Sequence, residues 1–118
     1  MRLFFLFAAD PIAEQSEPFL SDEFVNQCQR ILKITQDLQS VVSDEHSLRL
    51  RVEKMHQCVK AYLACAQDAE LQSQQWARIW WEKVGEKDSN LQAQMIHPDE
   101  FEMAVVVFKE ALKNYLSS

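Results

Sequence analysis

The sequence predicts an all-α fold, and three observations support this prediction. The 118 residues include one glycine and three prolines, too few for the many tight turns of β-sandwiches and barrels. Apolar residues recur every three or four positions along most of the chain, which is the period of an amphipathic helix. Hydrophobic residues make up 47% and charged residues 25%, as in ordinary globular domains. We therefore expect a single helical domain, residues 1–118, folded as a three- to four-helix bundle.

Residues 1–20 are expected to form an N-terminal packing segment followed by a connector. Residues 3–9 are all apolar, and Pro11 and Pro18 follow them. Residues 1–13 also resemble a short secretory signal, so secretion is the alternative to a cytoplasmic location. We favour packing because the apolar run is at the minimum length for a signal and lacks a clear cleavage site. It is too short to cross a bilayer, and we expect no membrane span.

The first long helix is predicted over residues 21–43. Ser21 is a suitable N-cap, and the acidic Asp22 and Glu23 suit the first turn. A stripe with alternating steps of four and three follows, made of Phe24, Cys28, Ile31, Thr35, Leu38 and Val42. The polar turn after it is short, which predicts that the next helix runs antiparallel as the second arm of a helical hairpin.

A second, longer helix is predicted over residues 47–84. Its apolar stripe keeps a heptad phase from Leu48 to Trp80, as in a coiled coil, and no glycine or proline interrupts it. We expect one continuous helix of about 57 Å with Gly85 as the residue just past its end. Such a helix would overhang its own domain, which is a reason to expect a partner. The alternative is a break near residues 67–73, giving four helices of similar length.

The last helix is predicted over residues 98–116, after a polar linker and a short helical turn in residues 86–97. Pro98 suits a first helical turn, and the acidic Asp99 and Glu100 follow it. Residues 103–108 are apolar almost all round. A helix of this kind must be covered on more than one side. Residues 3–7 and a second subunit are the two candidate covers.

Charge and cysteine content restrict the classes of ligand. The formal net charge is −6, whereas nucleic-acid binding requires a basic face, so we expect no nucleic-acid partner. Cys28, Cys58 and Cys65 have no spacing typical of a disulfide framework or a zinc site. We interpret them as small buried apolar residues in a reducing compartment. A single glycine excludes glycine-rich phosphate loops. We therefore expect no metal and no other cofactor.

Three tryptophans within six residues suggest a binding surface. We predict partner contact at Trp76, Arg78, Trp80 and Trp81, because tryptophan and arginine dominate interface hot spots. Trp76 and Trp80 lie on the apolar stripe, so a core role is the alternative for these two residues. Trp81 and Arg78 lie off the stripe, and they are the stronger candidates for a partner surface.

These observations favour a non-catalytic protein–protein interaction module of adaptor, chaperone or inhibitor type. We expect it to act through helix packing, with a protein partner or as a homodimer. One alternative is an enzyme, since Arg51 and His56 match the loose Arg-x4-His pattern of some helical ribonucleases. There the arginine stabilises charge and the histidine moves a proton. Another alternative is a regulatory module that binds a small apolar ligand between helices lined by the tryptophans.

Overall fold

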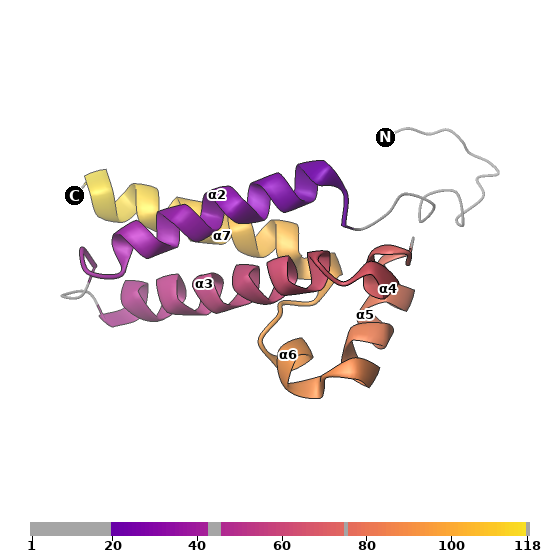
Figure 1. Cartoon of the computed structure of the whole chain (residues 1–118). Coiled ribbons are helices and arrows are strands. Elements are labelled where there is room, and N and C mark those ends of the chain that lie inside the picture. Colours follow the sequence, from indigo (N-terminus) through magenta and orange to yellow (C-terminus); the bar gives the residue numbers. More distant parts are fainter. Residues whose placement is uncertain (1–19, 43–45, 75, 118) are drawn as a thin grey trace.

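The computed structural model describes residues 20–42, 46–74 and 76–117, and there it is an all-α bundle (Figure 1). The long helices are α2 (Asp22–Leu38), α3 (His46–Ala66) and α7 (Pro98–Ser117). The shorter ones are α4 (Ala69–Gln72), α5 (Ala77–Lys87) and α6 (Ser89–Ala93). The predicted all-α fold class is confirmed. The predicted packing segment lies outside the described residues, apart from Leu20.

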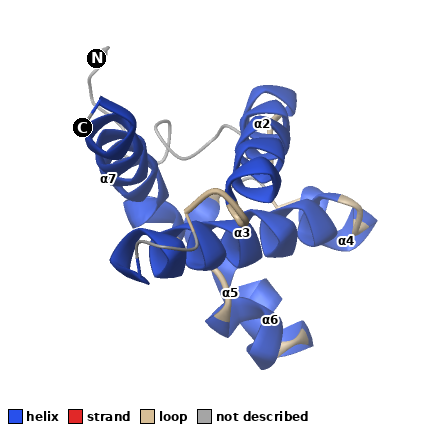
Figure 2. Cartoon of the chain, turned by 90° about the vertical axis from the view of Figure 1, so that its left-hand side faces the viewer, coloured by secondary structure: helices blue, strands red, loops and turns tan. Residues whose placement is uncertain are grey.

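Helices α2 and α7 lie on one side of α3, and α5 and α6 lie on the other (Figures 1 and 2). Helix α2 runs antiparallel to α3, which confirms the predicted helical hairpin. The predicted cap is also confirmed, because the Ser21 hydroxyl accepts a hydrogen bond from the Phe24 N–H at 3.2 Å. Helix α2 ends at Leu38, earlier than predicted, although Val42 in the following turn is still fully buried.

Tyr62 of α3 joins the helices at the centre of the bundle. Its ring lies 5.3 Å from that of Phe24 of α2 and 5.0 Å from that of Phe101 of α7, measured between centroids. On the other side it stacks on Trp80 of α5, at 5.5 Å and with only 8° between the ring planes. Such aromatic contacts stabilise a core beyond the area that they bury. One residue of α3 therefore contacts three other helices.

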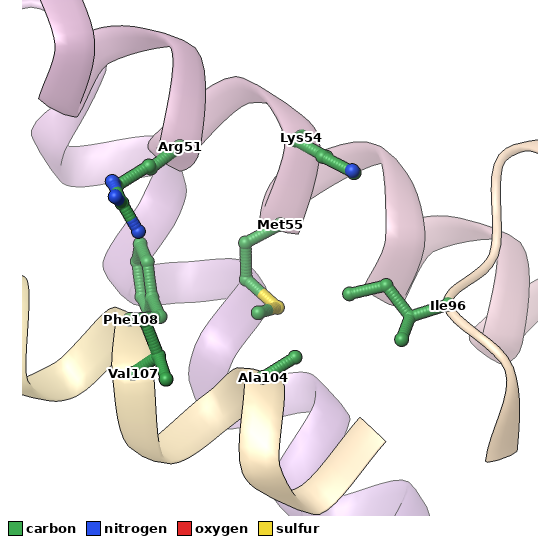
Figure 3. A pocket seen from close by; sticks show the side chains of 7 residues that line it. All are labelled: Arg51, Lys54, Met55, Ile96, Ala104, Val107 and Phe108. Atoms are coloured by element: carbon green, nitrogen blue, oxygen red, sulfur yellow. The ribbon is translucent and has the colours of Figure 1, made fainter. Parts of the chain in front are cut away.

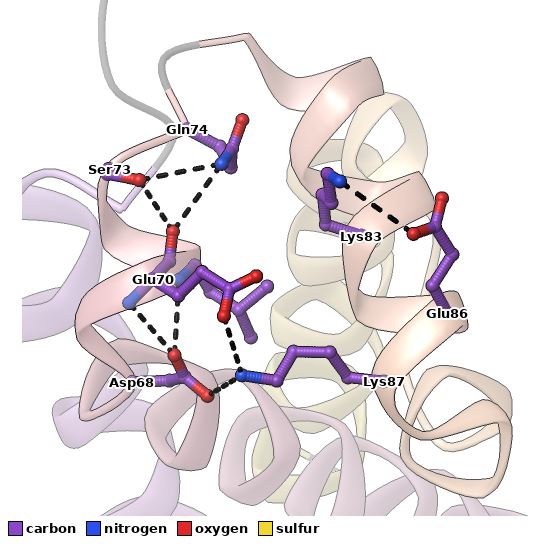
Figure 4. A network of polar contacts seen from close by, with 8 residues as sticks. Asp68, Glu70, Ser73, Gln74, Lys83, Glu86 and Lys87 are labelled. Carbon is purple, nitrogen blue, oxygen red and sulfur yellow. Dashed lines mark hydrogen bonds and ion pairs between the residues drawn. The ribbon is translucent and has the colours of Figure 1, made fainter.

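The prediction of one continuous helix over residues 47–84 is wrong. Helix α3 ends at Ala66, and Asp68 starts α4 by accepting from the backbone N–H groups of Glu70 and Leu71 at 3.0 and 3.2 Å. The ammonium of Lys87, at the end of α5, lies 2.7 Å from the Asp68 carboxylate (Figure 4). This hydrogen bond is the largest cause that lowers the pKa of Asp68. The chain turns at Asp68, within the alternative break near residues 67–73.

The heptad phase continues through the turn because both sides of it pack on the same core. Helix α5 runs at a steep angle to α3 (Figure 1), and Trp80 in it stacks on Tyr62. Within the turn the stripe is not buried, since Ala69 and Ser73 are exposed, and it returns to the core at Trp80. The expected overhang does not exist, so it no longer argues for a partner.

Gly85 does not end a helix as predicted, because α5 continues to Lys87. A Cβ atom at Gly85 would lie 2.4 Å from the Gln92 amide nitrogen, which donates to the Trp81 carbonyl at 2.9 Å. The glycine therefore leaves room for this link between α5 and α6. The final helix does begin at Pro98, as predicted.

Candidate functional site

A groove lined mainly by apolar side chains lies between α3 and α7. It encloses about 240 Å³, and Met55 of α3 and Phe108 of α7 meet in it (Figure 3). The residues that line it are Arg51, Lys54, Met55, Ile96, Ala104, Val107 and Phe108. The floor is apolar, and both cationic side chains extend from α3. We call these residues the α3–α7 groove.

Ile96, the end wall of the α3–α7 groove, is fixed by α3. Its backbone N–H donates to the Cys58 sulfur at 3.3 Å, and its carbonyl accepts a hydrogen bond from the Tyr62 hydroxyl. Both partners are buried core residues. The loop before α7 is therefore held at two backbone atoms of one residue, and the groove is preformed.

Apolar side chains continue the groove onto the surface. On α7, Met103 is 67% exposed and Val107 is 45% exposed. Leu50 of α3 is also exposed, and it lies one helical turn before Lys54 on the same side of that helix. Isolated exposed apolar residues are normal, but a contiguous group beside a cavity indicates an interaction site.

The cations at the rim differ from the two lysines of α5, which have carboxylate partners. Lys87 and Lys83 of α5 lie 2.7 and 3.8 Å from carboxylates (Figure 4). Arg51 and Lys54 are exposed, and neither forms an ion pair within the described ranges. The chain as a whole carries a net charge of −6. The α3–α7 groove is thus a cationic site on an acidic protein, and it favours a ligand with negative charges.

The tryptophan cluster does not form one surface. Trp80 is fully buried on Tyr62, so it serves the core in this fold. Trp76 is half-buried at the N-cap of α5, and Trp81 is half-buried with its ring 5.0 Å from that of His97. Arg78 is exposed. Trp80 therefore has the core role that was the alternative to partner contact. Partner contact by Trp76, Arg78 and Trp81 stays a prediction.

The structure does not bring Arg51 and His56 together. Arg51 lines the groove beside α7, whereas His56 is buried against α2, with Nδ1 2.7 Å from the Thr35 hydroxyl. The same hydroxyl lies 2.9 Å from the Leu32 carbonyl, so Thr35 connects the His56 ring to the backbone of α2. Burial, followed by the charge of Lys60, lowers the pKa of His56. The two residues predicted to cooperate face different helices.

The three cysteines are free and buried, as predicted. Burial raises the pKa of the Cys28 thiol to about 12 and those of Cys58 and Cys65 to about 11. Because the thiolate is the reactive form, these residues are poor nucleophiles. No group of three or more metal-binding side chains occurs in the described part of the chain. Within the same ranges, no helix is long and apolar enough to span a bilayer.

Sequence reasoning missed most of the groove. The tryptophans expected to line a ligand pocket do not contribute to it. Two signals pointed to it, namely the all-round apolar residues 103–108 and a second stripe on α7 formed by Glu100, Met103, Val107 and Glu110. Comparisons with protein-family models, curated proteins and solved structures found no match. Inference about function therefore depends on the geometry and chemistry of the groove.

Proposed function

We propose that this chain is a non-catalytic protein-interaction module that binds a helical segment of a protein in the α3–α7 groove. The observation that carries the proposal is a preformed apolar groove with exposed Met103 and Val107 beside it, whose rim cations form no ion pair with any described residue. An amphipathic helix can place its apolar face in such a groove and its acidic residues against the rim. Met55 supports this role, because methionine adapts to the shape of its neighbours.

A protein segment suits the groove better than a small apolar ligand. The groove encloses about 240 Å³. Pockets for drug-sized ligands have volumes of roughly 300–1,000 Å³ and bury most of the ligand surface. The exposed residues Leu50, Met103 and Val107 extend the apolar area well beyond the cavity itself. An occupant that covers them must be longer than the cavity, as a helix is.

A site-specific photocrosslink tests the proposal. A photoreactive phenylalanine analogue replaces Val107 in the full chain, which is expressed in its host cells and irradiated. The matched control carries the analogue at Ile34 of α2, which is 39% exposed and lies outside the groove. We expect a defined protein adduct from position 107 only. Adding Lys54→Glu should abolish this adduct, because it reverses the charge of the rim.

The outcome separates the alternatives. Equal adducts from positions 34 and 107 would show non-specific contact and would contradict the proposal. No adduct from either position would contradict it as well. An adduct whose mass is twice that of the chain identifies a second copy as the occupant, and any other mass identifies a different protein.

A further inference from the structure

We propose that the occupant of the α3–α7 groove is the α7 helix of a second copy of this chain, in an antiparallel, two-fold symmetric dimer. This inference rests on the proposed function and names its partner. It is carried by the match between the groove and the exposed face of α7. An isologous dimer requires that one surface patch be complementary to itself.

The exposed face of α7 has the chemistry that the groove requires. Glu100, Met103, Val107, Glu110 and Asn114 recur with steps of three, four, three and four, so they lie on one side of the helix. All five are exposed. The apolar pair at the centre is flanked by a glutamate at each end. The face is thus a short amphipathic stripe of the kind that docks in an apolar groove with a cationic rim.

The groove and the stripe occupy the same side of each copy. Val107 belongs to both, since it lines the cavity and stands at the centre of the stripe. Two copies that face each other can therefore each supply a stripe and receive one. This closes the dimer and leaves no free groove for further association.

Antiparallel packing brings the apolar centres of the two stripes together, and with them their glutamates. With the two-fold axis near Val105, Met103 of each copy lies opposite Val107 of the other. Glu100 and Glu110 of the two copies would then approach each other, and this repulsion requires compensation. Along the groove, Lys54 lies with Glu100 and Met103, and Arg51 lies with Val107 and Phe108. In this arrangement Glu110 of the second copy approaches the end of the groove that holds Lys54, Asp99 and Glu100, and its Glu100 approaches the end that holds Arg51.

Sedimentation velocity of the full chain from about 1 to about 100 µM tests the dimer, because this range resolves weak association. We expect a monomer–dimer equilibrium that weakens as salt increases, since salt screens the glutamate–cation contacts. Val107→Glu should raise the dissociation constant at least about 30-fold, the effect of losing an interface hot spot. Ile34→Glu is the matched control and should leave it unchanged. Circular dichroism melts verify that both variants are folded.

A charge reversal makes the test specific. Arg51→Glu with Lys54→Glu should abolish the dimer, and adding Glu100→Lys with Glu110→Lys should restore it. A monomer throughout the concentration range would overturn the inference, as would a dimer lost through Ile34→Glu but not through Val107→Glu. If the chain is monomeric while position 107 crosslinks to a different protein, the proposed function stands and only the second copy is excluded. If residues 1–19 of the same chain occupied the groove, the chain would be a monomer and position 107 would give no adduct with another protein. That result would contradict both the proposed function and the dimer.

Discussion

The two faces of α3 show how one helix can serve stability on one side and binding on the other. Toward the middle of α2 it is sealed, since Cys28, Ile31 and Thr35 are at most 2% exposed and His56 has a hydrogen-bond partner there, whereas a pocket opens beside Leu63 at the start of α2. Toward α7 it leaves the α3–α7 groove, with Arg51 and Lys54 exposed at the rim. A buried face stabilises the fold, whereas an exposed apolar face is available to bind a ligand. The contrast therefore separates substitutions that unfold the protein from substitutions that affect only binding.

The largest effect is expected on the sealed face. Ile31→Ala should lower the free energy of unfolding by about 2–5 kcal/mol, because it removes buried methyl groups and leaves a cavity. Ile34→Ala, on the same helix but 39% exposed, should change it by about 0.5 kcal/mol or less. Urea denaturation monitored by circular dichroism measures both. If the two substitutions cost the same, the α2 face is not sealed as described.

An intermediate effect is expected where the core supports the groove. Tyr62→Phe removes the hydrogen bond to the Ile96 carbonyl and should cost about 1 kcal/mol of stability. It should also speed amide hydrogen exchange at Ile96, because the loop would then be attached to α3 only through the bond from the Ile96 N–H to Cys58. The Met95 amide donates to the Gln92 carbonyl at 3.0 Å and serves as the internal control. Unchanged exchange at Ile96 would show that Tyr62 does not hold the wall of the groove.

The smallest effect on the free energy of unfolding at neutral pH is expected from the titration of His56. This effect increases as the pH falls. The pKa of His56 in the folded protein is lowered from 6.5 by burial and by Lys60, so the unfolded chain binds more protons below pH 6.5. The free energy of unfolding should therefore fall as the pH decreases through 6.5 toward the folded-state pKa. His56→Gln should reduce this slope, whereas His46→Gln, at an exposed position, should leave it intact. Stability curves at several pH values measure the slope, and an unaltered slope in His56→Gln would assign it elsewhere.

Local signals predicted much of the fold. The Ser21 cap, the stripe of α2 and the start of α7 at Pro98 depend on residues close together in the sequence. The break after Ala66 was predicted only as the alternative to a continuous helix, although part of its signal is local, since Asp68 caps α4 through the N–H groups of Glu70 and Leu71. The heptad phase misled because a repeat in the sequence does not show that every stripe position is buried, and Ala69 and Ser73 are exposed.

The candidate site was harder to predict than the fold. The unusual apolar content of residues 103–108 indicated a surface in need of cover, but not where that surface was. The groove combines residues from α3, α7 and the loop at Ile96, which come together only when Cys58 and Tyr62 hold that loop. The tryptophan cluster drew attention by its composition, and composition does not distinguish the buried Trp80 from the exposed Arg78.

The sequence alone determined that the protein is all-α, where α2, α3 and α7 begin, and which residues of α2 face a core. These properties follow from periodicity and from capping within a few residues. Only the tertiary structure decided that the long heptad stretch is interrupted by a turn, that His56 and Arg51 face different helices, and that an apolar groove with a cationic rim lies between α3 and α7. These properties depend on contacts between residues far apart in the chain, which no local pattern encodes.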